Sequence, residues 1–393
     1  MKIVHIITRL IIGGAQENTL LSCEGQHDLG HDVTLITGPA IGPEGSLMKR
    51  AQEYGYKVVI LDAMHRAIEP REDWKTYRNL VAMLRETKPD IVHTHSSKAG
   101  IIGRWAAHKA GCRGIVHTIH GLAFTASTSA MVNGVYKWLE RRTAPISTKI
   151  VCVADSMRDQ SLAANIGTFD QYVTVYSGME TRQFVNPPVD RATVRRELGL
   201  ADEQVAVGTI ARLFDLKGHD DLLDIAPRLC ERYPNLRWLW IGDGTLRPRF
   251  EARIKAMDLK DRFIFTGMVP PTKIPQLAGA MDILVHPSRR EGLARALPQG
   301  QLAGKPVITY DIDGAKEGVL DNVSGYVLPP FDKNQLAQKI ALLLDNPAQR
   351  QSMGEAGRAF ALSRFDTKVM VAGLEKVYQS VVMTNDETRN PNK

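Results

Sequence analysis

The chain has 393 residues, of which 44% are hydrophobic, 24% charged and 6% aromatic. This length suffices for two or three domains, each with its own core. The balance of apolar and charged residues excludes a disordered or fibrous protein. Fifty Lys and Arg against 43 Asp and Glu leave a net charge of +7, a mild excess that permits contact with phosphates or an anionic membrane but does not indicate nucleic-acid binding.

The cysteines and the N-terminal segment favour a cytoplasmic protein. The four cysteines are Cys23, Cys112, Cys152 and Cys230. Their scattered positions are typical of free thiols in a reducing compartment and argue against a structural zinc. No apolar run approaches the roughly 20 residues of a membrane-spanning helix. Because His5 and Arg9 interrupt the first apolar run, and no cleavage site of small residues follows it, we expect a buried strand there and no signal peptide.

In the first half of the chain, short β-branched runs alternate with amphipathic helical segments. We expect strands at 2–8, 33–37, 57–61, 90–94, 115–119, 149–153 and 172–176. Segments such as 15–30 and 74–88 are predicted to be helices, because their apolar residues recur every three or four positions. Continuous apolar strands joined by helices indicate a parallel sheet that is covered on both faces.

The pattern pauses at residues 180–200, where Pro187, Pro188 and a run of charges indicate a linker. It resumes with expected strands at 204–210, 236–242, 262–267, 282–287 and 305–310. We therefore predict two doubly wound, Rossmann-like α/β domains that face a central cleft. The expected parts are a first domain at 1–185, a second at 186–365, a helix at 366–382 that returns to the first domain, and a frayed tail at 383–393.

Ligands of open parallel sheets bind beyond the carboxyl ends of the strands, so the loops at those ends are the candidate site. Gly13 and Gly14 follow the first strand and precede a helix, where bare backbone could approach a phosphate, although a simple tight turn fits equally well. Arg212 and Lys217 share one strand-to-helix loop that ends at Gly218. A guanidinium and an ammonium suit a diphosphate, but two solvated loop charges remain the alternative.

A second loop of the same half carries a carboxylate. Glu291 follows a strand and precedes an expected helix, so it could face the cleft or simply cap that helix. Gln299 lies eight residues further on, about two turns into the helix, and Pro298 should kink the helix or leave its first turns irregular. Gly242, in a Gly-Asp-Gly sequence after another strand, indicates a turn, with a ligand role as the lesser alternative.

Histidines gather at the ends of two strands of the first half. Alternation places His93 and His95 on one face of a strand, and no carboxylate or cysteine lies within a few residues to complete a ligand set, so we expect no metal site. His120 follows the next strand and better suits a hydrogen-bonding or acid–base role in the cleft. For His93 and His117 a purely structural role is equally open.

In their order and spacing these segments resemble the retaining GT-B glycosyltransferases of family four over nearly the whole chain. The segments that carry the resemblance are GGAQENTL, PDIVHTHSSKAGIIGRWAA, HTIHG, VYSGMETRQF, IARLFDLKGHDDLL, WIGDGTLRP, FTGMV and PSRREGLARALPQGQLAGKPVI. The most specific feature is R-x-x-x-x-K-G followed by G-D-G and then by P-S-x-x-E-G. HTHSSKAG and HTIHG are most similar to bacterial cell-surface polysaccharide transferases.

The resemblance implies an acceptor-binding first domain and a nucleotide-sugar-binding second domain. It implies that the Gly14 amide meets the donor phosphate, that Arg212 and Lys217 hold the diphosphate, and that Glu291 binds hydroxyls of the transferred sugar. It also places His120 near the reacting centre. The implied catalytic set is His120, Glu291, Arg212 and Lys217. The implied donor-binding set is Gly13, Gly14, Arg212, Lys217, Gly242, Met268, Val269, Glu291, Gly292, Leu293 and Gln299.

Within that set, the backbone of Met268 and Val269 would meet the base. Two positions depart from the family pattern. Gln299 stands where the family has a second glutamate that binds the ribose, and an amide can still accept from one hydroxyl and donate to another. Glu180 replaces a usual aspartate, which is a milder change.

The implied activity is the metal-independent, retaining transfer of a hexosyl or N-acetylhexosaminyl group. The donor would be a nucleoside-diphosphate sugar, with a UDP-sugar favoured, and the acceptor a glycan or a lipid-linked molecule in cell-surface polysaccharide synthesis. No cofactor is expected. No metal is expected either, because no acidic DxD-type metal anchor appears at a strand end: Asp311 and Asp313 follow a late strand. A GT-B nucleotide-sugar epimerase and a non-catalytic nucleotide-sugar-binding protein are the alternatives.

The acceptor and the place of the protein in the cell are less defined. Residues 136–142 are basic and aromatic, and could rest on the anionic inner face of a membrane or form a helix with a solvated basic side. We expect a cytoplasmic protein without nucleic-acid partners. The base and sugar of the donor, the linkage and the oligomeric state do not follow from the sequence.

Overall fold

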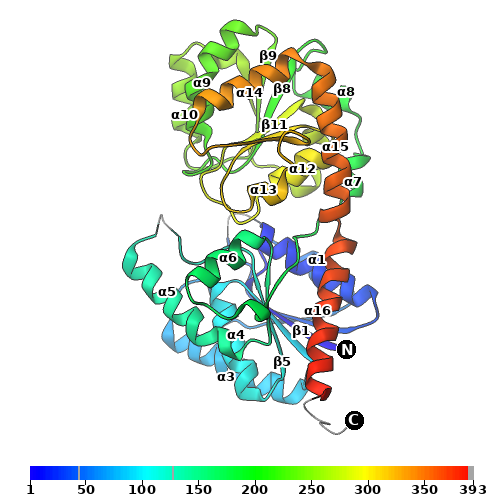
Figure 1. Ribbon diagram of the computed structural model, residues 1–393. Coiled ribbons are helices and arrows are strands. Elements are labelled where there is room, and N and C mark those ends of the chain that lie inside the picture. Colours follow the sequence, from blue (N-terminus) through cyan, green and yellow to red (C-terminus); the bar gives the residue numbers. More distant parts are fainter. Residues whose placement is uncertain (43–44, 126–127, 388–393) are drawn as a thin grey trace. The chain divides into compact units, whose positions relative to one another are not determined.

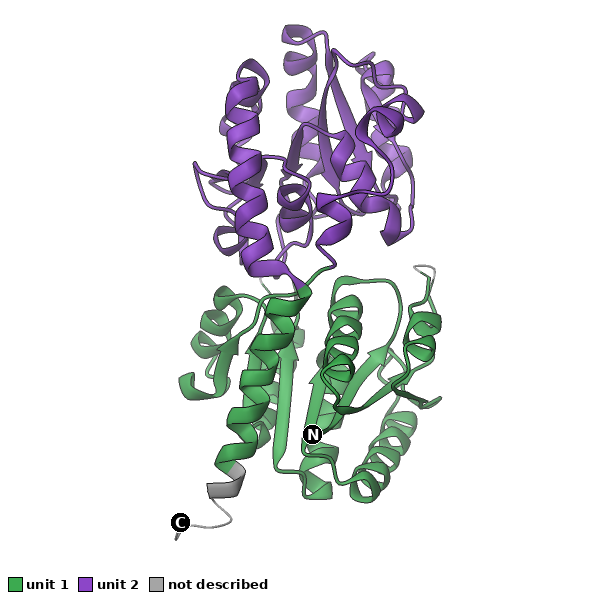
Figure 2. Cartoon of the chain, turned by 90° about the vertical axis from the view of Figure 1, so that its right-hand side faces the viewer, with its two compact units in different colours: residues 1–179, 367–393 green, residues 180–366 purple. Residues whose placement is uncertain are grey.

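The computed structural model describes residues 1–42, 45–125 and 128–387. The chain forms two compact units, which Figure 2 colours separately. Unit 1 comprises Met1–Met179 together with the chain from Thr367 onward, and unit 2 comprises Glu180–Asp366. The chain thus enters unit 2 six residues earlier than expected from the sequence. The reason is that the short helix α7 (Arg182–Val185) packs against helices of unit 2.

Unit 1 contains, in its described part, a sheet of seven parallel strands in the order β3-β2-β1-β4-β5-β6-β7. The strands are β1 (Lys2–Arg9), β2 (Asp32–Gly38), β3 (Lys57–Ile60), β4 (Ile91–His95), β5 (Gly114–Ile119), β6 (Lys149–Cys152) and β7 (Tyr172–Thr174). Every strand expected in the first half of the chain is present, with ends that differ by one or two residues.

Helices cover both faces of this sheet (Figure 1). They are α1 (Gly14–Asp28), α2 (Met48–Glu53), α3 (Pro70–Thr87), α4 (Ser97–Ala110), α5 (Ala130–Thr143), α6 (Asp155–Ala163) and α16 (Thr367–Glu387). Neighbouring residues of a strand point to opposite faces. Ile3 therefore packs in the cluster under α1 and α16, whereas Val4 packs in the cluster under α3 and α4.

The last helix of the chain, α16, supplies part of the core of unit 1. Its buried residues Met370, Leu374 and Val377 recur at helical spacing and pack against strands β1, β4 and β5. The helix continues five residues beyond the expected 366–382, to Glu387. Residues 388–393 of the expected frayed tail lie outside the described residues.

Unit 2 contains, among the residues described, six parallel strands in the order β10-β9-β8-β11-β12-β13. They are β8 (Val205–Ile210), β9 (Leu236–Ile241), β10 (Phe263–Phe265), β11 (Ile283–His286), β12 (Val307–Tyr310) and β13 (Gly325–Leu328). Strand β13 was not expected, because its four residues after a turn are too short a pattern to indicate a strand.

The remaining helices cover this second sheet. They are α7, α8 (Arg191–Glu197), α9 (His219–Arg232), α10 (Arg247–Ala256), α11 (Ile274–Ala280), α12 (Ala296–Leu302), α13 (Ala315–Gly318), α14 (Lys333–Asp345) and α15 (Pro347–Phe365). Trp238 and Trp240 of β9 belong to one apolar cluster, and Leu239 and Ile241 to the cluster on the opposite face. Both units are thus doubly wound parallel α/β layers, which confirms the predicted fold class.

A helix that crosses a bilayer needs about 20 predominantly apolar residues. Within the described ranges, no helix of either unit is at once long enough and apolar enough to cross a bilayer.

Candidate functional site

Three loops of unit 2 meet beyond the carboxyl ends of β8, β11 and β12. Residues 211–218 follow β8, and the loop after β11 is bonded to them: the Ser288 hydroxyl donates to the Leu216 carbonyl oxygen at 3.0 Å. The Arg289 amide donates to the same oxygen at 2.8 Å. Since parallel strands end at one edge of their sheet, this edge is where a ligand of unit 2 would be expected.

An ion pair joins the first two of these loops. Lys217 Nζ lies 2.5 Å from Glu291 Oε1, with the two side chains 23% and 20% exposed. His286, the last residue of β11, places its Nε2 3.0 Å from the same oxygen. The backbone amide of Glu291 donates to Asp313 Oδ2 at 2.9 Å, which ties in the loop after β12. Lys217 and Glu291, predicted separately, therefore lie in direct contact.

These neighbours keep the Glu291 carboxyl ionised. Burial raises its pKa, but the hydrogen bond and charge of His286 and of Lys217 outweigh burial and lower the pKa to about 2. At neutral pH the site therefore presents a carboxylate paired with an ammonium group. A ligand anion can compete for the ammonium, and ligand hydroxyls can donate to the carboxylate.

Glycines at two positions let these loops approach backbone to backbone. Gly218 has φ +77°, and a Cβ there would lie 1.9 Å from the Pro287 carbonyl oxygen. Gly242 has φ +136°, and a Cβ there would lie 2.2 Å from the Ala211 carbonyl oxygen. Both positions require glycine for conformation and for space. The backbone of Gly242 thus packs directly against the loop that carries Arg212, in agreement with the interpretation of Gly242 as a turn residue.

The helix expected directly after Glu291 begins later. Residues 289–295 form a loop and α12 starts at Ala296, so Gln299 lies in the first turn and not about two turns into the helix. The backbone amide of Gly314 donates to the Gly292 carbonyl oxygen at 3.0 Å, a bond that a helical segment would not leave available. Glu291 therefore does not cap α12, and that alternative is wrong.

Five other predicted residues of unit 2 lie in loops that follow β8, β10 and β11. Arg212 is exposed, with its guanidinium carbon 4.8 Å from the centre of the Phe214 ring. Met268, just after β10, is 62% exposed, and Val269 is half-buried against the apolar cluster of α8 and α11. Gly292 and Leu293 are half-buried in the loop after Glu291.

In unit 1, Gly13 and Gly14 begin helix α1. Gly13 precedes the helix with an extended φ of 178°, which any residue could adopt. A Cβ there would meet only the movable end of the Gln16 side chain, so the turn itself does not demand glycine. Gly14 is exposed in the first turn, where backbone amides have no acceptor within the helix.

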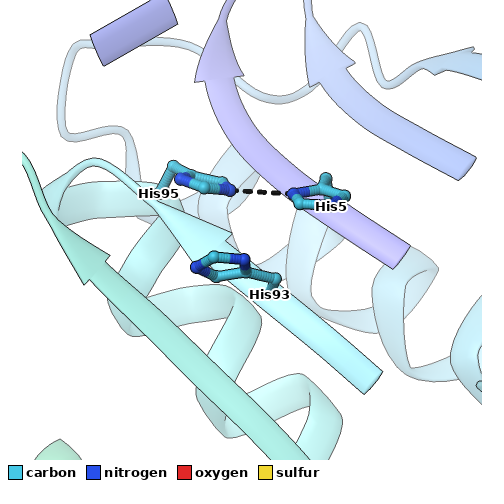
Figure 3. A group of neighbouring side chains, drawn as sticks. All are labelled: His5, His93 and His95. Carbon is cyan, nitrogen blue, oxygen red and sulfur yellow. Dashed lines mark hydrogen bonds between the residues drawn. The ribbon is translucent and has the colours of Figure 1, made fainter. Parts of the chain in front are cut away.

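Unit 1 also holds a cluster of buried histidines, and the sequence did not show that His5 belongs to it. His5 pairs in register with His93 on the neighbouring strand, and His95 lies on the same face (Figure 3). His5 Nδ1 lies 2.9 Å from His95 Nε2. Candidate ligand atoms of the three rings lie within 4.8 Å of one another. In the sequence no third ligand lies within a few residues of His93 and His95, and His5 was not foreseen because it comes from a distant strand.

The cluster extends to the predicted residue His120, whose Nε2 lies 3.0 Å from His95 Nδ1. Burial lowers the pKa of His5 to about 4 and holds those of His93 and His95 well below the ordinary value. The three rings are therefore uncharged at neutral pH. His117 lies across the sheet from them, with its Nδ1 3.0 Å from the Thr94 hydroxyl, which supports the structural role left open for it.

A further histidine is buried in unit 2. His219, the first residue of α9, lies between Trp240 and Phe250, with ring centroids 4.7 and 5.5 Å away. Neither of its ring nitrogens has a hydrogen-bond partner among the described residues. Burial, aided by the charges of His286 and Lys217, lowers its pKa to about 3.

Two family models match the chain, one for each half. Residues 12–183 match the model described as Glycosyltransferase Family 4, and residues 190–360 match Glycosyl transferases group 1. Over 350 residues the chain is 27% identical to the UDP-Gal:alpha-D-GlcNAc-diphosphoundecaprenol alpha-1,3-galactosyltransferase of Escherichia coli, covering 88% of each protein. It is 21% identical to the capsular polysaccharide biosynthesis glycosyltransferase CapM of Staphylococcus aureus, covering 86% of this chain and 89% of CapM.

Solved structures give the same fold. The chain matches HepE of Anabaena in complex with UDP-glucose with a TM-score of 0.81 and 22% identity, covering 97% of this chain and 100% of HepE. WaaG, a glycosyltransferase involved in lipopolysaccharide biosynthesis, matches with a TM-score of 0.74 at 16% identity, over 96% and 99% of the two chains. At these identities the likeness establishes the fold.

The buried His219 predicts a pH-dependent stability. Its folded pKa lies below the unfolded value near 6.5, so the unfolded state binds the extra proton and stability falls as pH drops from 6.5 toward 3. His219→Phe keeps a ring in place and removes this proton site. Urea unfolding should show the variant gaining about 2 kcal/mol on the parent between pH 8 and pH 5. Trp238→Phe, a buried position of the same unit without a group that titrates in this range, is the control and should leave the pH slope unchanged. Parallel curves for the parent and His219→Phe would contradict the account.

Proposed function

We propose that this chain, which belongs to the glycosyltransferases of the GT-B fold, moves a sugar from a nucleoside-diphosphate donor to a glycan or lipid-linked acceptor. The observation that carries the proposal is the Lys217–Glu291 pair, at 2.5 Å, in the strand-end loops of unit 2. The pair offers a cation for a diphosphate and an acceptor for sugar hydroxyls, and a nucleotide-sugar donor carries both of these groups.

The donor is proposed to be a UDP-sugar and the acceptor a lipid-linked or glycan molecule in cell-surface polysaccharide synthesis. The E. coli relative is named for UDP-Gal and for a diphosphoundecaprenol acceptor, and HepE was crystallised with UDP-glucose. In unit 2, Arg212 and Lys217 would bind the diphosphate, Glu291 the sugar hydroxyls and Gln299 the ribose. The backbone of Met268, a residue that is 62% exposed, would meet the base.

In the proposed reaction, the bond between the anomeric carbon and the diphosphate breaks while the acceptor oxygen attacks from the same face. The leaving phosphate oxygen takes the proton of the acceptor hydroxyl, so the configuration at the anomeric carbon is retained. Negative charge develops on the diphosphate, and Arg212 and Lys217 would stabilise it. Gly14 and His120 of unit 1 keep their proposed roles beside the phosphate and the reacting centre.

Helix α5 of unit 1 supports a contact between this protein and a membrane. Met131, Val135 and Trp138 are 81%, 54% and 55% exposed, and basic residues adjoin them on the same helix. The guanidinium carbon of Arg142 lies 5.6 Å from the centre of the Trp138 ring. Exposed apolar side chains beside cations suit an anionic lipid surface, where a lipid-linked acceptor would be found.

Arg212 and Lys217 form the proposed diphosphate clamp, and a variant of Lys217 tests it. Lys217→Ala should lower kcat/KM for a UDP-sugar on the order of 100-fold, because one stabilising charge on the leaving group is lost. The measurement is the rate of nucleoside diphosphate release. Lys333→Ala, which removes a surface partner of Asp224 in the same unit, is the matched control and should behave like the parent. Turnover by Lys217→Ala at the parent rate would refute the clamp.

Metal independence is a separate prediction. If Arg212 and Lys217 neutralise the diphosphate, then turnover should be the same in EDTA as in added Mg²⁺ or Mn²⁺. The rate of UDP release in each condition measures this. Activity that disappears in EDTA and returns with a divalent cation would show that a metal does this work.

The membrane contact is tested by co-sedimentation with liposomes. The parent should bind vesicles that contain anionic phospholipid, more weakly as salt increases, and should not bind neutral vesicles. Trp138→Ser should reduce binding several-fold, whereas Met383→Ser, at a 65% exposed position on α16, should not. Equal binding by both variants, or binding that salt does not change, would exclude α5 as the contact.

A further inference from the structure

A continuous chain of hydrogen bonds runs from His120 into the interior of unit 1. His120 Nε2 lies 3.0 Å from His95 Nδ1, and His95 Nε2 lies 2.9 Å from His5 Nδ1. The other nitrogen of His5, Nε2, lies 2.6 Å from Gln26 Oε1 on helix α1. The His5 and His95 rings are stacked, with an interplanar angle of 14°. Three aromatic rings are thus linked end to end and terminate on an amide.

The inner end of this chain is held by the last helix. Gln26 Nε2 donates to the Tyr378 hydroxyl of α16 at 2.9 Å. The same hydroxyl lies 2.6 Å from His93 Nδ1, and His93 Nε2 lies 2.6 Å from the Thr118 hydroxyl. Gln26 and Tyr378 are fully buried. The Gln26 amide therefore cannot exchange its partners for water without leaving buried groups unpaired.

Gln26 gives the chain a direction. Since its nitrogen donates to Tyr378, its oxygen must accept, and His5 must carry its hydrogen on Nε2. A neutral imidazole has one donor and one acceptor, so His5 Nδ1 accepts from His95 Nε2–H. By the same rule, His95 Nδ1 accepts from His120 Nε2–H. Each step follows because burial keeps His5 and His95 uncharged.

We propose that Gln26, His5 and His95 are positioning residues that hold His120 as the Nε2–H tautomer, with that hydrogen directed into unit 1 and with Tyr378 as the anchor. The Nδ1 atom of His120 is then the acceptor of the ring. The tautomer follows from the hydrogen bonds and from the burial of the rings, and it does not depend on the proposed function. Its consequence for turnover rests on the proposed function, in which His120 lies near the reacting centre.

The same contacts decide against a resident metal at this cluster. All six ring nitrogens of His5, His93 and His95 have hydrogen-bond partners within unit 1. The 2.9 Å contact between His5 and His95 requires a proton between two nitrogens, where a cation would otherwise bind. A metal would have to displace that proton and break bonds that are satisfied.

The direct test is the tautomer itself. In the full chain labelled with ¹⁵N-histidine, long-range ¹H–¹⁵N correlation at pH 7.5 should show His5, His95 and His120 as Nε2–H tautomers. A signal of Nδ1–H type, or an average of both tautomers, at His120 would overturn the proposal. Equimolar Zn²⁺ should leave these signals unchanged. Replacement of the His5 and His95 proton signals by metal-bound shifts would also overturn it.

Variants at Gln26 separate positioning from packing. Gln26→Met keeps the volume and removes the acceptor, so His120 should show mixed tautomers and kcat should fall on the order of tenfold with KM little changed. Gln26→Glu keeps an acceptor for His5 and should restore the Nε2–H tautomer. A parent-like His120 tautomer in Gln26→Met would overturn the proposal, whatever the activity.

Tyrosine variants provide the matched control for stability. Tyr378→Phe removes the anchor of Gln26, whereas Tyr172→Phe removes another buried hydroxyl of unit 1, which donates to the Ile166 carbonyl oxygen at 2.8 Å. Both should lose similar stability to urea, but only Tyr378→Phe should change the His120 tautomer. An equal change of the His120 tautomer in both variants would indicate loosened packing and would contradict the positioning role of Gln26 and Tyr378. If the parent shows the expected tautomers but releases UDP from no donor, the proposed function is refuted and the positioning of His120 stands.

Discussion

Lys217 and Glu291 come from two different strand-end loops, and their 2.5 Å contact ties those loops together. The carboxylate would be costly to place there alone, because its side chain is four-fifths buried and burial raises its pKa. His286 and Lys217 offset that cost, so the carboxylate remains ionised. In the proposed function, a diphosphate, which carries more charge than one carboxylate, would take Lys217 while sugar hydroxyls would donate to Glu291. The close backbone approach at Gly218 brings the loop of Lys217 next to the loop of Glu291.

Unit 1 meets a comparable constraint with uncharged groups. Hydrogen-bond partners stabilise its buried imidazoles, because an unpaired polar atom in the interior is unfavourable. His5 and His95 bond to each other, Gln26 of α1 accepts from His5, and the Tyr378 hydroxyl of α16 bonds to both Gln26 and His93. The last helix of the chain therefore contributes to unit 1 in two ways, through apolar residues in its core and through one hydroxyl that fixes the direction of a polar network.

Much of the fold followed from local pattern. Runs of β-branched residues predicted the strands to within two residues, since a buried parallel strand is apolar throughout. Strand β13 was missed because Gly325–Leu328 is only four residues long. The start of α12 was misplaced because the Gly292 and Asp313 hydrogen bonds that keep residues 289–295 out of a helix come from a loop about twenty residues away.

Individual residues of the site could be predicted, but their partners largely could not. Lys217 and Glu291 follow recognisable strands, and their proximity follows from the common edge of the sheet. His286 and Asp313, which fix Glu291, carry no local signal. His5 could have been paired with His93, because the usual strand order of a doubly wound sheet sets the first strand beside the fourth. Gln26 and Tyr378 lie on helices whose rotation about their axes only the packed structure defines.

The central claim is that this chain transfers a sugar from a nucleoside-diphosphate donor with retention of configuration. The most direct measurement incubates a panel of nucleoside-diphosphate sugars with candidate lipid-linked and glycan acceptors, and records both nucleoside diphosphate release and the anomeric configuration of the product by NMR. The account predicts acceptor-dependent release from a UDP-sugar and a product with the anomeric configuration of its donor. An inverted product, or an altered donor sugar with no transfer to any acceptor, would contradict it.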